Sequence, residues 1–169
     1  MELGFDQPMI KKMHKDSMAT AKKLEHMRSL ESRTIRDNDL RRRITLAKYL
    51  FSAVNPKVVA FLVSIHVDPD VFADRVLTSQ EKIIQFFKSM PTSYCLVQLT
   101  LYRDMQRTRK IQPNDLNDIV SLSIAIPYSD VVVTERMWQT AIIQTKIHEL
   151  RPTIILSSAK ELAPILELR

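Results

Sequence analysis

The pattern of apolar and polar positions predicts helices over most of the first 110 residues. Residues 9–36 lack proline and glycine and are rich in Ala, Met, Lys, Leu and Glu, so one long helix or two are expected there. The apolar face of this segment is thin, with Ile10, Met18, Ala21 and Leu24 near helical spacing. A helix with so little apolar surface packs on one side only, or is held by a partner.

Shorter helices are expected to follow, each bounded by a cap or a proline. Residues 37–39 (Asp-Asn-Asp) should break the chain and cap a second helix, which Asn55-Pro56 ends. The apolar segment Val58–Val67 allows a buried strand, but amid so much helix it is predicted to be a buried helix. Asp68 is expected to cap a short helix over residues 71–76.

Two longer helices are predicted before residue 110. Residues 78–81 (Thr-Ser-Gln-Glu) have the Thr-x-x-Glu form of a capping box, which predicts a helix that starts at Thr78 and runs to Met90. Pro91 stops that helix, and another is expected over residues 92–110.

The last third of the chain has a different pattern. The expected elements are a helix over 115–125, a turn over 127–130, a strand over 131–134, a helix over 135–150, a strand over 152–157 and a short helical end. Both strands are β-branched and apolar on both faces, as in buried parallel strands. Such pairs normally belong to larger sheets, so further strands are expected at 58–67, at 96–101 or outside this chain. The predicted fold is an α-rich α/β class with a small parallel sheet: a helical region over 1–90 and an α/β part over 91–169, or one compact unit.

Composition excludes several classes of protein. The chain has 169 residues, of which 45% are hydrophobic and 26% charged, as in ordinary globular domains. The single cysteine, Cys95, excludes an intramolecular disulfide, and the only glycine, Gly4, excludes a glycine-rich phosphate loop. No apolar run approaches the length of a membrane span and no signal peptide is visible, so a cytoplasmic protein without a membrane partner is expected.

Positive charge is concentrated at the N-terminal end. Residues 1–50 contain 12 Lys and Arg against 7 Asp and Glu, whereas residues 51–169 contain 13 against 12. This asymmetry suggests contact with a polyanion, although Lys and Arg on a solvated helix face are the commoner explanation.

An acidic group is the strongest candidate for chemistry. The predicted helix that begins near Asp115 and Asp118 is about 18 Å long, and the following strand, which ends at Glu135, is about 15 Å long. The chain turns back between them, so the start of the helix should lie beside the carboxyl end of the strand, where α/β sheets place ligands. Crowded carboxylates suit Mg²⁺ or Mn²⁺, which can activate water against a phosphodiester. Alternatively, these acids bind no metal and lie where they do because acidic side chains are stabilising at helix N-termini.

At these residues the chain resembles the C-terminal half of a PIN domain, over about residues 92–168. The resemblance rests on Asp118, on Thr134-Glu135 after a Val-Val-Val strand, and on the final helix–strand–helix. It implies a metal-dependent nuclease that acts on RNA, with Asp118 and Glu135 as catalytic metal ligands and Asp115 as an auxiliary ligand. The family's last acid is usually Asp and often stands one residue later, where this chain has Arg136. The family's first acid has its only counterpart in Asp68.

Basic and aromatic side chains near the acids are candidates for holding a nucleic-acid substrate. Arg103, Arg107 and Lys110 share one face of the helix predicted over 92–110, and Arg109 and Tyr128 lie close to the acids in sequence. An exposed helix face is the alternative.

Two functional hypotheses follow. The first is a PIN-like endoribonuclease dependent on Mg or Mn, or the C-terminal part of one. The second is a non-catalytic, degenerate PIN-like module that binds a protein or nucleic acid. In either case the N-terminal helices are expected to support self-association or to bind a protein partner.

Overall fold

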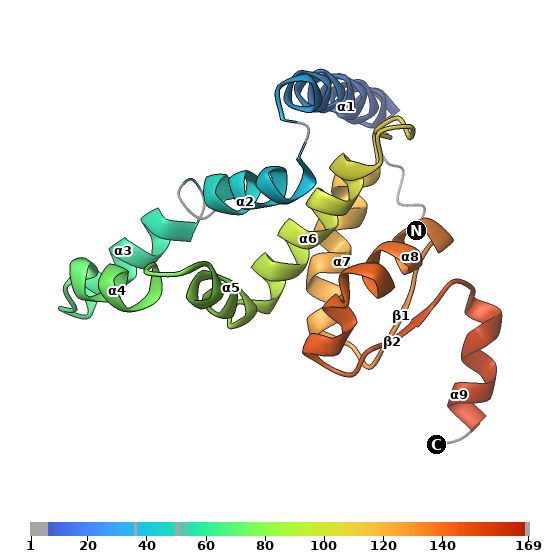
Figure 1. Ribbon diagram of the computed structural model, residues 1–169. Coiled ribbons are helices and arrows are strands. Elements are labelled where there is room, and N and C mark those ends of the chain that lie inside the picture. The colour runs from blue at the N-terminus through green and yellow to red at the C-terminus, as the bar shows by residue number, and fades with distance from the viewer. Residues whose placement is uncertain (1–6, 36, 50–51, 53, 168–169) are drawn as a thin grey trace.

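The computed structural model describes residues 7–35, 37–49, 52 and 54–167 (Figure 1). Within these residues the chain forms nine α-helices, two short 3₁₀ helices and two strands, which confirms an α-rich α/β fold with a small parallel sheet. No helix in the described part is long and apolar enough to cross a membrane.

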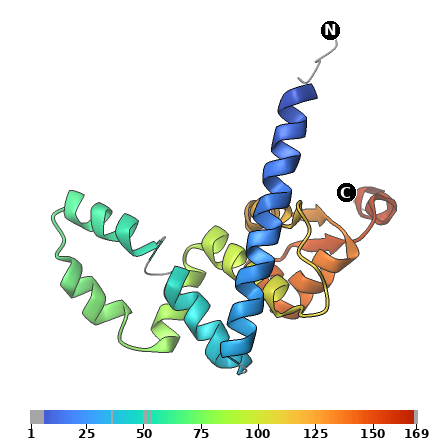
Figure 2. The same ribbon diagram turned by 90° about the horizontal axis from the view of Figure 1, so that it is seen from above.

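The predicted N-terminal helix is a single continuous rod. Helix α1 spans Gln7–Thr34, and its N-terminal half extends beyond the rest of the molecule (Figure 2). Helix α2, Asn38–Tyr49, starts where predicted, because a carboxylate oxygen of Asp37 accepts the backbone N–H groups of Asp39 and Leu40.

Helices α3 (Asn55–Ser64), α4 (Pro69–Val76) and α5 (Gln80–Lys88) form an arm to one side of the molecule (Figure 1). The segment predicted as a buried helix is helical, but most of α3 is solvent-exposed. Asn55-Pro56 opens α3, with the proline in its first turn where the missing N–H costs nothing.

The caps of α4 and α5 show one success and one error of prediction. Asp68 caps α4 as expected, by accepting the N–H of Asp70. The cap of α5 is Ser79, not Thr78, because the Ser79 hydroxyl accepts the N–H of Lys82. The predicted capping box therefore does not form.

Helices α6 (Pro91–Met105) and α7 (Asp115–Tyr128) pack side by side at the centre of the molecule (Figure 1). Helix α6 ends five residues earlier than predicted, so a loop over 106–114 connects the two helices. Helix α7 continues through Pro127, which the sequence had indicated as part of a turn.

The sheet has two parallel strands in the described residues. Strand β1, Val131–Val133, pairs with β2, Ile154–Leu156, in the register Val132 to Ile155. The prediction that both faces of the strands are buried is wrong, because Val133 and Ile154 are largely exposed. Helix α7 contacts β1, and the helix that follows β1 contacts β2.

The chain between and after the strands is broken into shorter helices than expected. Helix α8 spans Arg136–Thr145, and the left-handed conformation of Lys146 separates it from the 3₁₀ helix η2, Ile147–Leu150. After β2 come η3, Ala159–Leu162, and α9, Ala163–Glu167.

One hydrophobic core joins the two regions on either side of position 90. Phe87 of α5 packs in the same cluster as Leu99 of α6, Ile119 of α7 and Trp138 and Ile142 of α8. All five side chains are almost completely buried. The start of α7 and the end of β1 are therefore both positioned by the same buried hydrophobic core.

Candidate functional site

The structure brings the three predicted acids together around one cavity of about 280 Å³. Asp115 and Asp118 come from the first turn of α7, and Glu135 comes from the end of β1. The sheet ladder continues one residue past β1, where the Thr134 N–H donates to the carbonyl of Leu156 at 3.0 Å. This bond holds Glu135 at the carboxyl end of the strands, which is where the element lengths place it. The remaining lining residues are Arg109, Gln112, Pro113 and Asn114.

Asp115 is the most buried acid of the site, with 1% of its surface exposed. The Arg109 guanidinium donates two hydrogen bonds to it, from Nη1 to Oδ2 at 2.7 Å and from Nη2 to Oδ1 at 2.6 Å. The backbone N–H of Gln112 donates to the same Oδ2 at 2.9 Å. Both carboxylate oxygens of Asp115 are therefore engaged by donors of the loop 106–114.

Arg109 faces all three acids of the cavity. Its hydrogen bonds with Asp115 raise the pKa of the guanidinium, and the charges of Asp115, Glu135 and Asp118 raise it further. A fixed cation thus already offsets the mutual repulsion of the carboxylates. This relation was not expected from the sequence, which suggested Arg109 as a contact for nucleic acid.

The other two acids have different surroundings. Oδ2 of Asp118 accepts a hydrogen bond from Nε1 of the buried Trp138 at 3.2 Å. Glu135 is the N-cap residue of α8, but its side chain makes no capping hydrogen bond. Trp138 is both a core residue and a hydrogen-bond donor to the site.

The donor set does not fit the metal site that the resemblance implies. Among the described residues, no group of three or more His, Cys, Asp or Glu side chains is arranged to hold a metal ion. Oδ2 of Asp115, the proposed auxiliary ligand, already accepts two hydrogen bonds, so Asp115 could offer a metal only the second lone pair of Oδ1, beside the Arg109 charge. The other two acids of the cavity, Asp118 and Glu135, share it with the Arg109 guanidinium.

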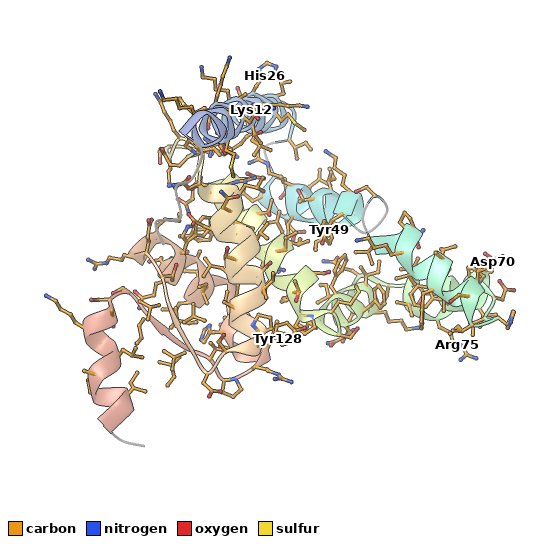
Figure 3. The ribbon with its side chains drawn as sticks, turned by 180° about the vertical axis from the view of Figure 1, so that it is seen from behind. Lys12, His26, Tyr49, Asp70, Arg75 and Tyr128 are labelled. Carbon is orange, nitrogen blue, oxygen red and sulfur yellow. The ribbon has the colours of Figure 1, made fainter. Side chains whose placement is uncertain are left out.

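The basic residues proposed for substrate binding do not form one helix face. Because α6 ends at Met105, Arg107 and Lys110 lie in the loop, where both are exposed. Arg103 is still on α6 but is only 3% exposed and pairs with Asp104. Tyr128 is exposed, but it lies at the opposite end of α7 from the cavity (Figure 3).

Two side chains of α1 clamp the loop that follows α6. Arg28 donates from Nη1 to the carbonyl of Gln106 at 3.0 Å and from Nη2 to that of Arg109 at 2.7 Å. Glu25 accepts the backbone N–H of Ile111 at 2.8 Å and also pairs with Arg28. These two side chains hold the loop in the conformation that presents Arg109 to Asp115.

Little in the amino-acid sequence indicates this clamp. Arg28 stands with Ala21 on the thin apolar face of α1, and both are buried. The indication that the sequence offers is the position of Arg28 itself, on the packing side of an otherwise exposed helix.

Comparisons with protein-family models, with curated proteins and with solved structures found no match. The resemblance to PIN domains therefore stays a prediction that rests on Asp118, Thr134 and Glu135.

Proposed function

We propose that this chain is a non-catalytic module that binds a protein or nucleic acid, the second of the two functional hypotheses. The observation that carries the proposal is the double hydrogen bond from Arg109 to the buried Asp115. This pair gives Asp115 a structural role, because it holds the loop 106–114 against the start of α7.

The energetics of a buried ion pair favour this interpretation. Removing one partner of such a pair costs about 3–5 kcal/mol, because the other charge is left buried without compensation. A divalent ion that displaced Arg109 from Asp115 would forfeit this existing pairing, and it would also experience repulsion from the nearby Arg109 charge. The resident cation thus competes directly with a metal.

An exposed apolar row on α7 supports an interaction role. Leu116, Val120, Ile124 and Tyr128 recur every four residues and are between 42% and 62% exposed. The exposed residues between them, such as Ser121, are uncharged. Exposed apolar surface of this continuity is typical of a contact with another protein.

The nuclease hypothesis stays a second candidate because Asp118 and Glu135 line the same cavity. In that case Mg or Mn would be the cofactor and RNA the substrate, and the metal would have to be held close to the Arg109 charge. The two candidates thus differ in whether the acidic cavity holds a metal ion in the working protein.

A cleavage assay separates the candidates. Purified protein is incubated with labelled RNA and single-stranded DNA in the presence of Mn²⁺, alongside the double variant Asp118→Asn, Glu135→Gln. We expect no cleavage above the level of the double variant. Cleavage by the wild-type chain that the double variant lacks would establish the nuclease and refute the non-catalytic module.

A further inference from the structure

The outward face of α1 carries a concentration of positive charge. At about 100° per residue, six basic positions fall within a sector of about 120° around the helix axis. They are Lys11, Lys12, Lys15, Lys22, Lys23 and His26, and all six side chains are exposed. We call this set the lysine face.

The lysine face contains no acid. Of the acids between residues 11 and 28, Asp16 lies just outside the sector and Glu25 lies on its other side, engaged with Ile111 and Arg28. The buried residues of α1, Ala21 and Arg28, lie on the side away from the lysines. Figure 3 shows Lys12 and His26 on α1 at the outer end of the molecule.

The position of α1 leaves this charge accessible. The N-terminal half of the helix extends clear of the other elements (Figure 2), so a large ligand can approach it from several directions. The first turn of α1 has no acidic residue that would offset the charge of the lysines that follow it.

We propose that the lysine face binds the phosphate backbone of double-stranded DNA, with the projecting half of α1 in the major groove. This inference rests on the proposed function and names the partner of the module. A row of lysines about 18 Å long matches a polyanion, because duplex DNA carries one charge for about every 1.7 Å of its axis.

The chemistry of the face distinguishes duplex DNA from other polyanions. Its exposed side chains include no Phe, Tyr or Trp, so it lacks the broad stacking surface on which single strands depend. The major groove of B-form DNA is about 12 Å wide and admits an α-helix, whereas that of RNA duplexes is narrow. A helix that lies in a bilayer surface needs a free apolar face, and in α1 the side opposite the lysines packs on the protein through Ala21 and Arg28.

The test is binding of a labelled DNA duplex of about 20 base pairs, measured by fluorescence anisotropy between about 50 and 200 mM salt, with EDTA present. Five lysine contacts predict a slope of log K against log salt of about −4.5, at about −0.9 for each phosphate neutralised. The triple variant Lys11→Gln, Lys12→Gln, Lys15→Gln should lower affinity and reduce the slope by about 2.7. Circular dichroism checks that the variant remains helical.

A matched control variant removes the same number of positive charges from another part of the molecule. Lys57, Lys82 and Lys88 are exposed on α3 and α5, and their replacement by Gln should leave the slope within about one unit of the wild-type value. Equal loss in both triple variants, tighter binding of an RNA duplex or a single strand of the same length, or no DNA binding at the lowest salt would overturn the proposal.

The outcome of this DNA-binding test can be distinguished from the outcome of the cleavage assay. DNA binding through the lysine face with metal-dependent cleavage would refute the non-catalytic function and leave this inference standing. Absence of both binding and cleavage would overturn this inference alone.

Discussion

Arg109 and Asp115, six positions apart, are joined by two parallel hydrogen bonds of 2.7 and 2.6 Å that close the loop between α6 and α7. The pair turns the most buried acid of the cavity into part of the framework. Charged partners in this fork geometry are among the stronger hydrogen bonds in proteins. The cavity and the loop therefore have to be considered as one structural unit.

Loss of Arg109 should destabilise the fold. In Arg109→Met, the Asp115 carboxylate stays buried with only the Gln112 N–H as partner, so the free energy of unfolding should fall by about 3 kcal/mol. Urea denaturation measures this loss. The exposed Arg107→Met serves as control and should change stability by less than about 0.5 kcal/mol. Equal stability of the two variants would mean that the ion pair does not hold the loop.

Loss of Arg28 should open the loop without disturbing the core. Its guanidinium is buried against the carbonyls of Gln106 and Arg109, so Arg28→Met removes the side-chain donor from both and leaves the Gln106 carbonyl with the backbone N–H of Arg109. We expect limited trypsin digestion to cut the variant after Arg107 or Lys110 at least tenfold faster than the wild type. The exposed Arg42→Met should be cut there at the wild-type rate.

Glu25 should make stability depend on acid pH. The N–H of Ile111, and then Arg28, lower the pKa of this carboxyl below its ordinary value of 4.5. Because the folded pKa is the lower one, the contribution of Glu25 is present above pH 4.5 and is lost as pH falls through the folded pKa. The stability difference between wild type and Glu25→Gln should therefore shrink from pH 6 towards about pH 3. A difference that stays the same between pH 6 and pH 3 would contradict this role of Glu25.

The Cys95 thiol should be inert in the folded protein. It is 0% exposed, and burial raises its pKa to about 12, so almost no thiolate forms at neutral pH. A thiol reagent such as DTNB should react with native protein only as fast as the chain unfolds. Addition of urea above the unfolding midpoint should make the reaction complete within the dead time of manual mixing. Rapid labelling of the native protein would contradict the packing of α6.

Much of the helical framework follows from local sequence. Asp37 and Asp68 cap helices as predicted, because a cap depends on the few residues around it. The cap of α5 was misplaced by one residue, since Thr78 and Ser79 are both suitable caps and the choice depends on the loop before them. The loop after α6 could not be predicted, because Arg28, about 80 positions away, binds its carbonyl groups.

The candidate site, like the helices, could be predicted only in part from the sequence. The approach of Asp118 and Glu135 could be predicted, because it depends only on the lengths of one helix and one strand. The partner of Asp115 could not, because the loop conformation that presents Arg109 is set by Glu25 and Arg28 of α1. The exposure of Val133 was also missed, since a strand of three valines looks the same whether one or both of its faces are covered.

The central claim, that Arg109 occupies the acidic cavity in place of a metal, is tested most directly by titration of Mn²⁺ against thermal unfolding. A metal bound only by the folded chain would add about 2.7 kcal/mol at one hundred times its Kd. For a chain of this length that is a rise in Tm of about 5–10 °C. We predict no rise in the wild type beyond that of Asp118→Asn at any Mn²⁺ concentration up to about 10 mM. A rise of several degrees that Asp118→Asn abolishes would contradict the account.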